Sequence, residues 1–287
     1  MISAQNLRQI KLRIKSIGNT RKITKAMEMV SASKLSRTKG PFFLVKLYAE
    51  AIEAMLYNLI SDSPGTGNPL LRKRDSVKHS TLCVVTSDTG LCGTYNDNVI
   101  GCAEKFLESL KTPEVSIIAI GKEGYNHFRR KGLHHIARSY PGLYGRYSSE
   151  ASDRISGDLV DMFSRGETDE LHIAYSHFKT SLRHAPAVEK VLNIEPLPRP
   201  RRYYTFEPGA QAILDRMAPR YIVYKMRSIL LEAFTSEHSA RMLAMKIATD
   251  NADDLTGQLT LARNKARQFA ITKEVLEIAS SAEALKG

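Results

Sequence analysis

Residues 1–60 carry apolar side chains at helical spacing. Three or four residues separate successive members of the first run: Leu7, Ile10, Ile14 and Ile17, then, after a phase shift, Ile23, Met27 and Val30. A second run continues the narrow stripe: Leu44, Leu47, Ala51, Ala54 and Met55. This spacing predicts a long amphipathic helix. The Gly40-Pro41 pair predicts a kink or a break within it.

Residues 208–287 predict a second long helix. No proline follows Pro219, and the only interior glycine after it is Gly257. A helix of about 70 residues would reach roughly 100 Å. Its apolar seam alternates steps of four and three: Ile222, Met226, Ile229, Ala233, Ser236, Ala240, Leu243 and Ile247. These steps are the heptad of a left-handed coiled coil. A second phase then uses Leu255, Leu259, Ala262, Ala266 and Phe269, so the pairing should change near 250–255.

The central residues, 76–206, alternate between strand-like and helix-like segments. Strands are expected at 81–86, 115–120, 171–175 and 188–194. Helices are expected at 98–110, 123–130 and 149–165. Such alternation predicts a mostly parallel sheet covered by helices.

Neither terminal helix could bury its apolar stripe alone, although the two lie at opposite ends of the sequence. Pairing them antiparallel would bury both stripes. The predicted fold is therefore an α/β protein with long helices, in which an antiparallel coiled coil of the terminal helices accompanies a central Rossmann-like domain. The expected segments are 1–60, 76–206 and 208–287.

Charge is concentrated at the start of the chain. The formal net charge is +12, and residues 1–40 contain ten Lys or Arg side chains but only one acid, Glu28. This asymmetry favours an acidic partner. The same residues contain no aromatic side chain that could stack on bases. An acidic protein surface therefore explains the charge at least as well as a nucleic acid does.

The cysteine and hydropathy patterns argue against a disulfide-rich, a zinc-binding and a membrane-spanning protein. Cys83, Cys92 and Cys102 are odd in number and show no CxxC spacing, which argues against a disulfide framework or a zinc site. No apolar run is long enough for a transmembrane helix. The basic, amphipathic N-terminus resembles a mitochondrial presequence in composition, but its periodicity continues without a cleavage-like break.

Residues 87–96 are a candidate phosphate-binding loop, because they follow the first strand and precede a helix. Phosphate-binding loops sit at that place in parallel sheets. The glycines here are spaced GxxG, and no lysine occupies the Walker position, so a structural turn is favoured over a nucleotide site. Cys92 has no histidine in the loop to activate it and is expected to be a small buried residue. The histidines lack metal-ligand spacing, and no carboxylate pair suggests acid–base catalysis. No cofactor is expected.

Motifs at both termini and in the middle resemble the gamma subunits of bacterial F-type, proton-translocating ATP synthases. They are Ile17–Leu35 with the run AMEMV, Ser87–Gly93, Ser239–Lys246, Ala248–Ala252, Asn264–Gln268 and Ile271-Thr272. The resemblance covers essentially the whole chain. Thr89 departs from it, because the family usually has Arg there, and Thr94 stands where a small residue is common.

The resemblance implies a non-catalytic rotor subunit of the central stalk. In this family the coiled coil enters a ring of three alpha and three beta subunits, while the globular domain, with the epsilon subunit, sits on the membrane ring of c subunits. Proton flow turns the c ring, and the stalk carries that rotation to the beta subunits, where ATP is made or hydrolysed. Membrane association is then indirect, at the cytoplasmic face of the bacterial inner membrane.

The resemblance also assigns contact residues. Arg267, Gln268 and Thr272 match positions that hydrogen-bond a beta-subunit loop, and Met27 sits where the stalk meets an acidic segment of beta. Tyr204 and Glu207 lie where the family's globular domain touches the c ring. Two other functions stay open from the residues alone: a nucleic-acid-binding coiled-coil protein and a nucleotide-binding α/β enzyme.

Overall fold

The computed structural model describes residues 4–62, 67–71, 74, 76–143, 147–181, 183–195, 206–207 and 209–284. The chain divides into two compact units. The first unit joins Met1–Val30 to Met242–Gly287, and the second spans Ser31–Arg241. Helix α1 (Ala4–Asp62) and helix α5 (Ala210–Ala284) each contribute residues to both units. The units therefore divide the chain within these two helices, and the expected segments 1–60, 76–206 and 208–287 stay a prediction.

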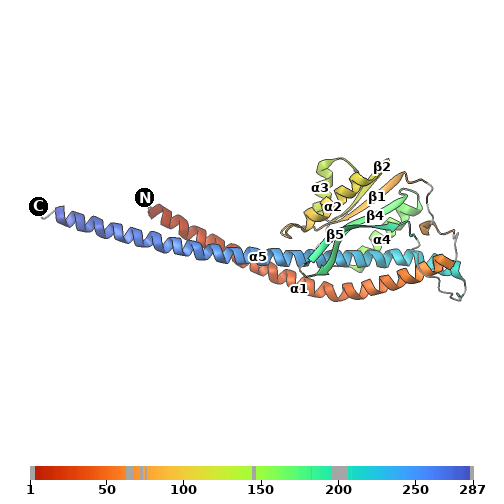
Figure 1. The fold of residues 1–287 in the computed structure, drawn as a ribbon, viewed down its shortest axis with the longest axis horizontal. Coiled ribbons are helices and arrows are strands. Elements are labelled where there is room, and N and C mark those ends of the chain that lie inside the picture. The colour runs from red at the N-terminus through yellow and green to blue at the C-terminus, as the bar shows by residue number, and fades with distance from the viewer. Residues whose placement is uncertain are drawn as a thin grey trace. The chain divides into compact units, whose positions relative to one another are not determined.

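In the first unit, α1 and α5 run antiparallel and side by side (Figure 1). The hydroxyl of Thr249 donates to that of Thr24 at 2.8 Å. Arg21, one turn earlier in α1, forms an ion pair with Asp253, one turn later in α5. The contact one turn earlier in α1 thus pairs with the residue one turn later in α5, which is the pattern of an antiparallel helix pair, as expected.

Small side chains fill the seam of the first unit, in place of several of the apolar residues that the sequence suggested. The buried positions are Thr24, Met245, Thr249, Ala252 and Ala266. Four expected seam residues are largely exposed instead: Ile23 (61%), Ile247 (52%), Leu255 (44%) and Phe269 (65%). The expected seam was wrong at these positions, whereas Ile10, Ile14 and Ile17 are half-buried and Ala266 is buried. Short Thr side chains let two helices approach closely, and an apolar periodicity does not detect them.

The second unit contains a five-stranded sheet of order β3-β2-β1-β4-β5. Its strands are β1 (His79–Val85), β2 (Glu114–Ile120), β3 (His135–Tyr140), β4 (Glu170–Thr180) and β5 (Arg183–Leu192). The first four are mutually parallel, and β5 pairs antiparallel with β4. The predicted α/β class and mostly parallel sheet are confirmed. The sequence reading missed β3, because an edge strand of sequence HIARSY has no apolar run.

Helices cover both faces of this sheet (Figure 1). The helices between the strands are α2 (Tyr95–Ser109), α3 (Lys122–Lys131) and α4 (Ser149–Ser164), and a short 3-10 turn spans Pro69–Leu71. Residues of α2 and α3 form a core with one face, around Leu82 and Ile117. Residues of α4, α1 and α5 form a larger core with the other face, around Ile173.

Helix α1 continues through Gly40-Pro41 without a break. The ring of Phe42 is 1% exposed and makes an edge-on contact with Phe178 of β4, with 6.1 Å between ring centroids. This packing compensates for the backbone hydrogen bond that proline cannot make. The buried face of this part of α1 is Phe42, Ala49, Ile52, Leu56 and Leu59. The stripe expected there was wrong, since its members Leu44, Leu47 and Met55 are 57–71% exposed.

Among the helices that the structure describes, none is both long enough and apolar enough to cross a membrane.

Candidate functional site

The three residues assigned to a beta-subunit contact lie together on the exposed end of α5. Arg267, Gln268 and Thr272 all follow Ala266, the last buried residue of this helix, and all three are exposed. The Thr272 hydroxyl donates to the backbone carbonyl of Gln268 at 2.9 Å. The guanidinium of Arg267 and the amide of Gln268 are therefore presented to the surroundings from adjacent positions on one helix.

Met27 occupies a different place in the same unit. It is half-buried on α1, one turn from Thr24, which pairs with Thr249 of α5. Thr249 precedes Arg267 by about 27 Å of helix at 1.5 Å per residue. The structure thus separates Met27 from the Arg267 group, so the four residues form two surfaces.

The two residues assigned to the c ring belong to the second unit. Glu207 is exposed and lies just before α5. Tyr204 lies outside the described residues. The contact assigned to this pair stays a prediction.

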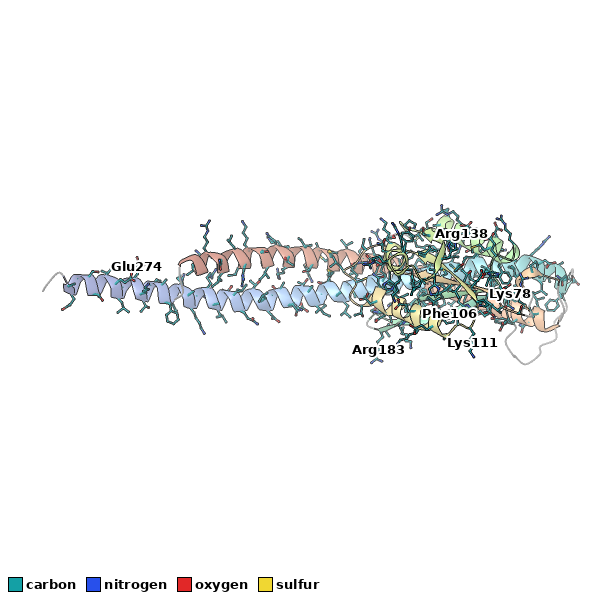
Figure 2. All side chains as sticks on the ribbon, turned by 90° about the horizontal axis from the view of Figure 1, so that it is seen from above. Lys78, Phe106, Lys111, Arg138, Arg183 and Glu274 are labelled. Carbon is teal, nitrogen blue, oxygen red and sulfur yellow. The ribbon has the colours of Figure 1, made fainter. Side chains whose placement is uncertain are left out.

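The end of α5 beyond Ala266 exposes large apolar side chains. Its exposed apolar residues are Phe269, Ile271, Val275, Leu276 and Ile278, each 53–65% exposed. Glu274, labelled in Figure 2, belongs to this part of α5, which extends past the N-terminal end of α1. Apolar residues exposed over several consecutive turns indicate a surface that another protein covers.

Basic side chains are exposed along α1 in the first unit. They are Arg8, Lys11, Arg13, Lys15, Lys22 and Lys25. Lys25 bonds to Glu28 of the same helix at 3.0 Å. Because these cations stand on a helix surface, they can face an acidic protein segment at close range, where opposite charges attract.

Residues 87–96, the candidate phosphate loop, lie at the carboxyl end of β1, where the strand order of the sheet reverses. Rossmann-like folds bind nucleotides in the crevice at this point. In this chain several of the loop's polar groups are bonded within the protein. Asn96 accepts from the amide of Ser87 at 3.0 Å, and Asp88 accepts from the amides of Lys122 and Gly142 at 3.0 and 3.1 Å.

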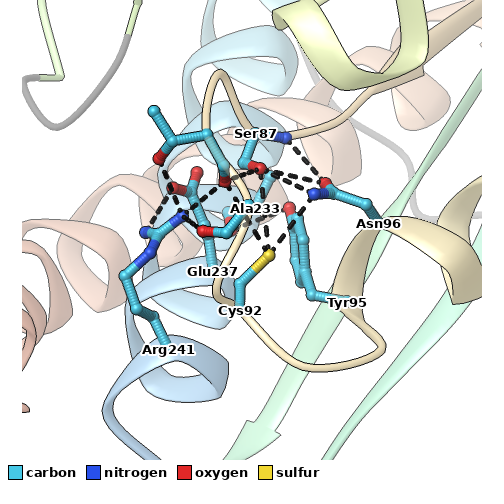
Figure 3. A network of polar contacts seen from close by, with 9 residues as sticks. Ser87, Cys92, Tyr95, Asn96, Ala233, Glu237 and Arg241 are labelled. Atoms are coloured by element: carbon cyan, nitrogen blue, oxygen red, sulfur yellow. Dashed lines mark hydrogen bonds and ion pairs between the residues drawn. The ribbon is translucent and has the colours of Figure 1, made fainter. Parts of the chain in front are cut away.

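Helix α5 contacts this loop through Arg241, which also forms a buried ion pair within the helix (Figure 3). Arg241 donates through one amino group to Glu237 at 2.6 Å and through the other to the carbonyl of Thr89 at 2.9 Å. Tyr95, which opens α2, donates to the backbone carbonyl of Ala233 at 3.2 Å. A phosphate would need free amide donors here, whereas the loop presents carbonyls to a guanidinium. The geometry is that of a structural turn held against α5.

The pKa shifts of the buried cysteines and of Glu237 argue against a catalytic role for these residues. Burial raises the pKa of the Cys92 thiol although Arg241 opposes the shift, and burial raises the pKa of Cys83 to about 12. Both side chains are therefore neutral thiols, which are poor nucleophiles. Burial also raises the pKa of Glu237, against the influence of Arg241. Among the described residues, no group of His, Cys, Asp and Glu side chains is arranged to hold a metal.

Sequence reasoning missed the Arg241 network. The available signal was the i,i+4 spacing of Glu237 and Arg241, which places both side chains on one helix face. Thr89 belongs to the same network, because its hydroxyl lies 3.3 Å from Arg241. An arginine at position 89 would bring a second guanidinium beside the first.

Comparison with known proteins places these observations in a family. Residues 6–285 match a family model described as ATP synthase. The ATP synthase gamma chain of Geotalea uraniireducens (strain Rf4) is 37% identical over 288 residues, which cover 98% of this chain and 99% of the relative. The ATP synthase gamma chain of Chloroflexus aurantiacus is 40% identical over 285 residues, which cover 97% and 98%.

Solved structures agree on the fold. A chain of the Euglena gracilis mitochondrial ATP synthase, OSCP/F1/c-ring, in rotational state 3, aligns with a TM-score of 0.69 at 16% identity, covering 99% of this chain and 95% of that one. A chain of the Tetrahymena thermophila mitochondrial ATP synthase, central stalk/c-ring, aligns with a TM-score of 0.62 at 20% identity, covering 79% and 99%.

Proposed function

This chain belongs to the ATP synthase gamma chain family, and from that membership we propose that it is the central-stalk rotor subunit of an F-type ATP synthase. It couples proton-driven rotation of a c ring to ATP synthesis or hydrolysis in the beta subunits. It forms and breaks no bonds itself. Its partners are three alpha and three beta subunits, an epsilon subunit and the c ring.

The observation that carries this proposal is the exposed end of α5. Five large apolar side chains beyond Ala266 remain uncovered, and a helix of this kind suits insertion into a sleeve formed by other subunits. Among its charged side chains, Lys273 and Glu277 bond to each other at 3.4 Å. Charges paired within the helix are weaker anchors to a surrounding sleeve, which suits rotation.

The contact surfaces follow from the same role. Arg267, Gln268 and Thr272 would hydrogen-bond a beta-subunit loop, because their polar groups are exposed on one helix end. Met27 and the basic face of α1 would meet an acidic segment of beta. Tyr204 and Glu207 would contact the c ring. The complex would attach this chain indirectly to the cytoplasmic face of the bacterial inner membrane.

The residues support neither a nucleotide-binding enzyme nor a nucleic-acid-binding protein. A nucleotide-binding enzyme would need amides directed at a ligand in residues 87–96, whereas this loop turns the carbonyls of Thr89 and Gly90 toward Arg241. A nucleic-acid-binding protein would need base-stacking rings on the basic helix, and residues 1–40 have none.

The test uses the whole membrane-bound complex of the same organism, including the c ring. We expect the full chain to co-purify with the alpha and beta subunits. A chain ending at Ala266 should leave the second unit folded while ATP-driven proton pumping falls relative to ATP hydrolysis, since the inserted end of α5 is gone. Lys111→Ala, outside this helix, is the matched control. Equal coupling by truncated and full chains would contradict the proposal.

A further inference from the structure

A charged cavity lies inside the second unit. It has a volume of about 200 Å³ and lies between α1, the β4–β5 hairpin and α5. Its titratable and charged lining residues are Lys46, Glu50 and Glu53 of α1, Tyr175 and His177 of β4, Glu189 of β5, and Lys225 and Glu232 of α5. We call it the Glu232 cavity. A group of this composition costs free energy to bury unless its charges are paired.

His177 stands between two carboxylates of this cavity. Its Nε2 lies 3.3 Å from Glu189 Oε1, and its Nδ1 lies 3.2 Å from Glu232 Oε1. A neutral imidazole carries one N–H group, so it could donate to only one of the two carboxylates. Only the protonated ring donates to both. The positions of the three side chains are therefore those of an imidazolium bridging two carboxylates.

Glu232 is the more buried of the two partners, with 5% of its side chain exposed. Its Oε1 also accepts from the amide of Phe178 at 3.0 Å, and the ammonium of Lys46 lies 3.9 Å away. One carboxylate of α5 thus contacts both β4 and α1. Loss of the proton from His177 would leave either this carboxylate or that of Glu189 facing a ring lone pair, because the neutral ring keeps only one N–H group.

The second carboxylate continues the network toward α1. Lys225 lies 3.2 Å from Glu189 and 3.9 Å from Glu53. Glu53 in turn accepts from the hydroxyl of Tyr221 at 2.8 Å. The charged groups therefore connect all the elements that surround the cavity.

We propose that His177 is a proton-dependent tie between the β4–β5 hairpin and α5, which keeps the Glu232 cavity closed while its imidazole is protonated and loosens it when the proton leaves. The inference does not depend on the rotor role, because it concerns packing within one unit. With the proton in place, Lys46, Lys225 and His177 balance the charges of Glu53, Glu189 and Glu232, and only the exposed Glu50 is left over. Without it, the cavity gains a further net negative charge and an unsatisfied contact.

The electrostatic environment agrees with this geometry. Hydrogen bonds to Glu189 and Glu232 raise the pKa of His177 to about 9, against the opposing influence of burial. Burial disfavours the charged form of Glu189, but His177 and Lys225 outweigh it and hold that pKa at about 2. Burial raises the pKa of Tyr175, so this phenol stays neutral.

The direction of the pH effect follows from linkage. The pKa of His177 is higher in the folded chain than its ordinary value of 6.5. Its contribution to stability is therefore complete below pH 6.5 and is lost as the pH rises toward 9. We expect the hairpin to open locally in this alkaline range, well before the chain as a whole unfolds.

The direct test is an NMR titration of the full chain with labelled histidine, in which His177→Gln assigns the resonance. We expect the His177 signal to titrate with a midpoint near 9. A midpoint at or below 6.5 would overturn the proposal. If the variant does not fold, correlation of the ring signals with the backbone signals of the unmodified chain supplies the assignment instead, so the titration still decides the question.

The second test measures amide exchange of residues 175–191, corrected for the intrinsic effect of pH. Protection in the unmodified chain should fall roughly tenfold or more between pH 7 and 9.5. His177→Gln, which cannot change its charge, should show no such fall. His79→Gln, which alters a partly exposed histidine paired with Glu114, should behave like the unmodified chain. An equal fall in His177→Gln would contradict a role for this residue.

Discussion

The two compact units stabilise similar helices with different side chains. In the first unit, α1 and α5 meet through Thr24, Thr249 and Ala252, and their aliphatic residues Ile10, Ile14 and Ile17 are only half-buried. In the second unit, the same two helices pack on a sheet, and residues such as Leu56, Leu159 and Ile173 are fully buried. Burial of apolar surface is the main favourable term in folding. The second unit should therefore hold most of the stability, while the first is a slender helix pair.

The ion pairs of the two units differ in the same way. Arg241 and Glu237 in the second unit have side chains that are 3% and 2% exposed. Arg21 and Asp253 in the first unit are 47% and 48% exposed. Both are Arg–carboxylate contacts, but water can replace the partner only in the exposed pair. Burial, rather than the type of contact, decides how much each pair matters.

The largest effect is expected from Glu237→Gln. The substitution leaves Arg241 buried without its counter-charge, which should cost about 3–5 kcal/mol of the free energy of unfolding. Asp253→Asn is the matched control in the first unit and should cost less than about 1 kcal/mol. Hydrogen exchange of β1 and of α5, combined with urea unfolding, measures both. Similar costs in the two variants would mean that burial does not separate the units.

A comparable effect is expected from removing a core aliphatic side chain. Leu159→Ala should cost about 2–5 kcal/mol, because the residue is 0% exposed and a cavity would remain among α4, the sheet and α5. Ile14→Ala, in the half-buried seam of the first unit, should cost about 1–2 kcal/mol, since water already reaches it. Urea unfolding of each variant gives the values. A larger cost for Ile14→Ala would reverse the proposed ranking of the units.

How far the sequence predicts this molecule also differs between the units. In the second unit, the seam of α5 from Ile222 to Ala240 is buried as the heptad indicated, and large apolar residues mark its first half, Ile222, Met226 and Ile229. In the first unit, the most buried seam positions include Thr24 and Thr249, which helical periodicity of apolar residues cannot detect. The edge strand β3 was missed for a related reason, since its side chains are mostly polar.

The candidate contact surfaces, too, could be predicted from the sequence only in part. The motif around Arg267 identified an exposed helix end, which an apolar pattern alone would have assigned to a continuing coiled coil. The Arg241 network joins Glu237 to Thr89 and Gly90, residues about 150 positions apart that only the folded chain brings together. No spacing rule within the sequence could have predicted that contact.

The smallest effect is expected at the polar pair of the seam. Thr249→Val removes the donor to the Thr24 hydroxyl and should cost about 0.5–1.5 kcal/mol. The double change Thr24→Val with Thr249→Val should cost little more than the single change, because the bond between the two hydroxyls is already lost and Thr24 otherwise bonds only within its own helix, to the carbonyl of Arg21 at 3.0 Å. Hydrogen exchange of residues 10–30 measures both. A single variant as stable as the unmodified chain would show that this hydrogen bond does not help to hold the two helices together.

The rotor role can be observed directly by following the orientation of the second unit. A fluorescent probe attached through Lys111→Cys, with Cys102→Ser to remove the partly exposed native thiol, would report on this chain within a complex whose alpha and beta subunits are fixed to a surface. Addition of ATP should turn the probe in steps and in one direction. A probe that stays still while the complex hydrolyses ATP and retains this chain would contradict the account.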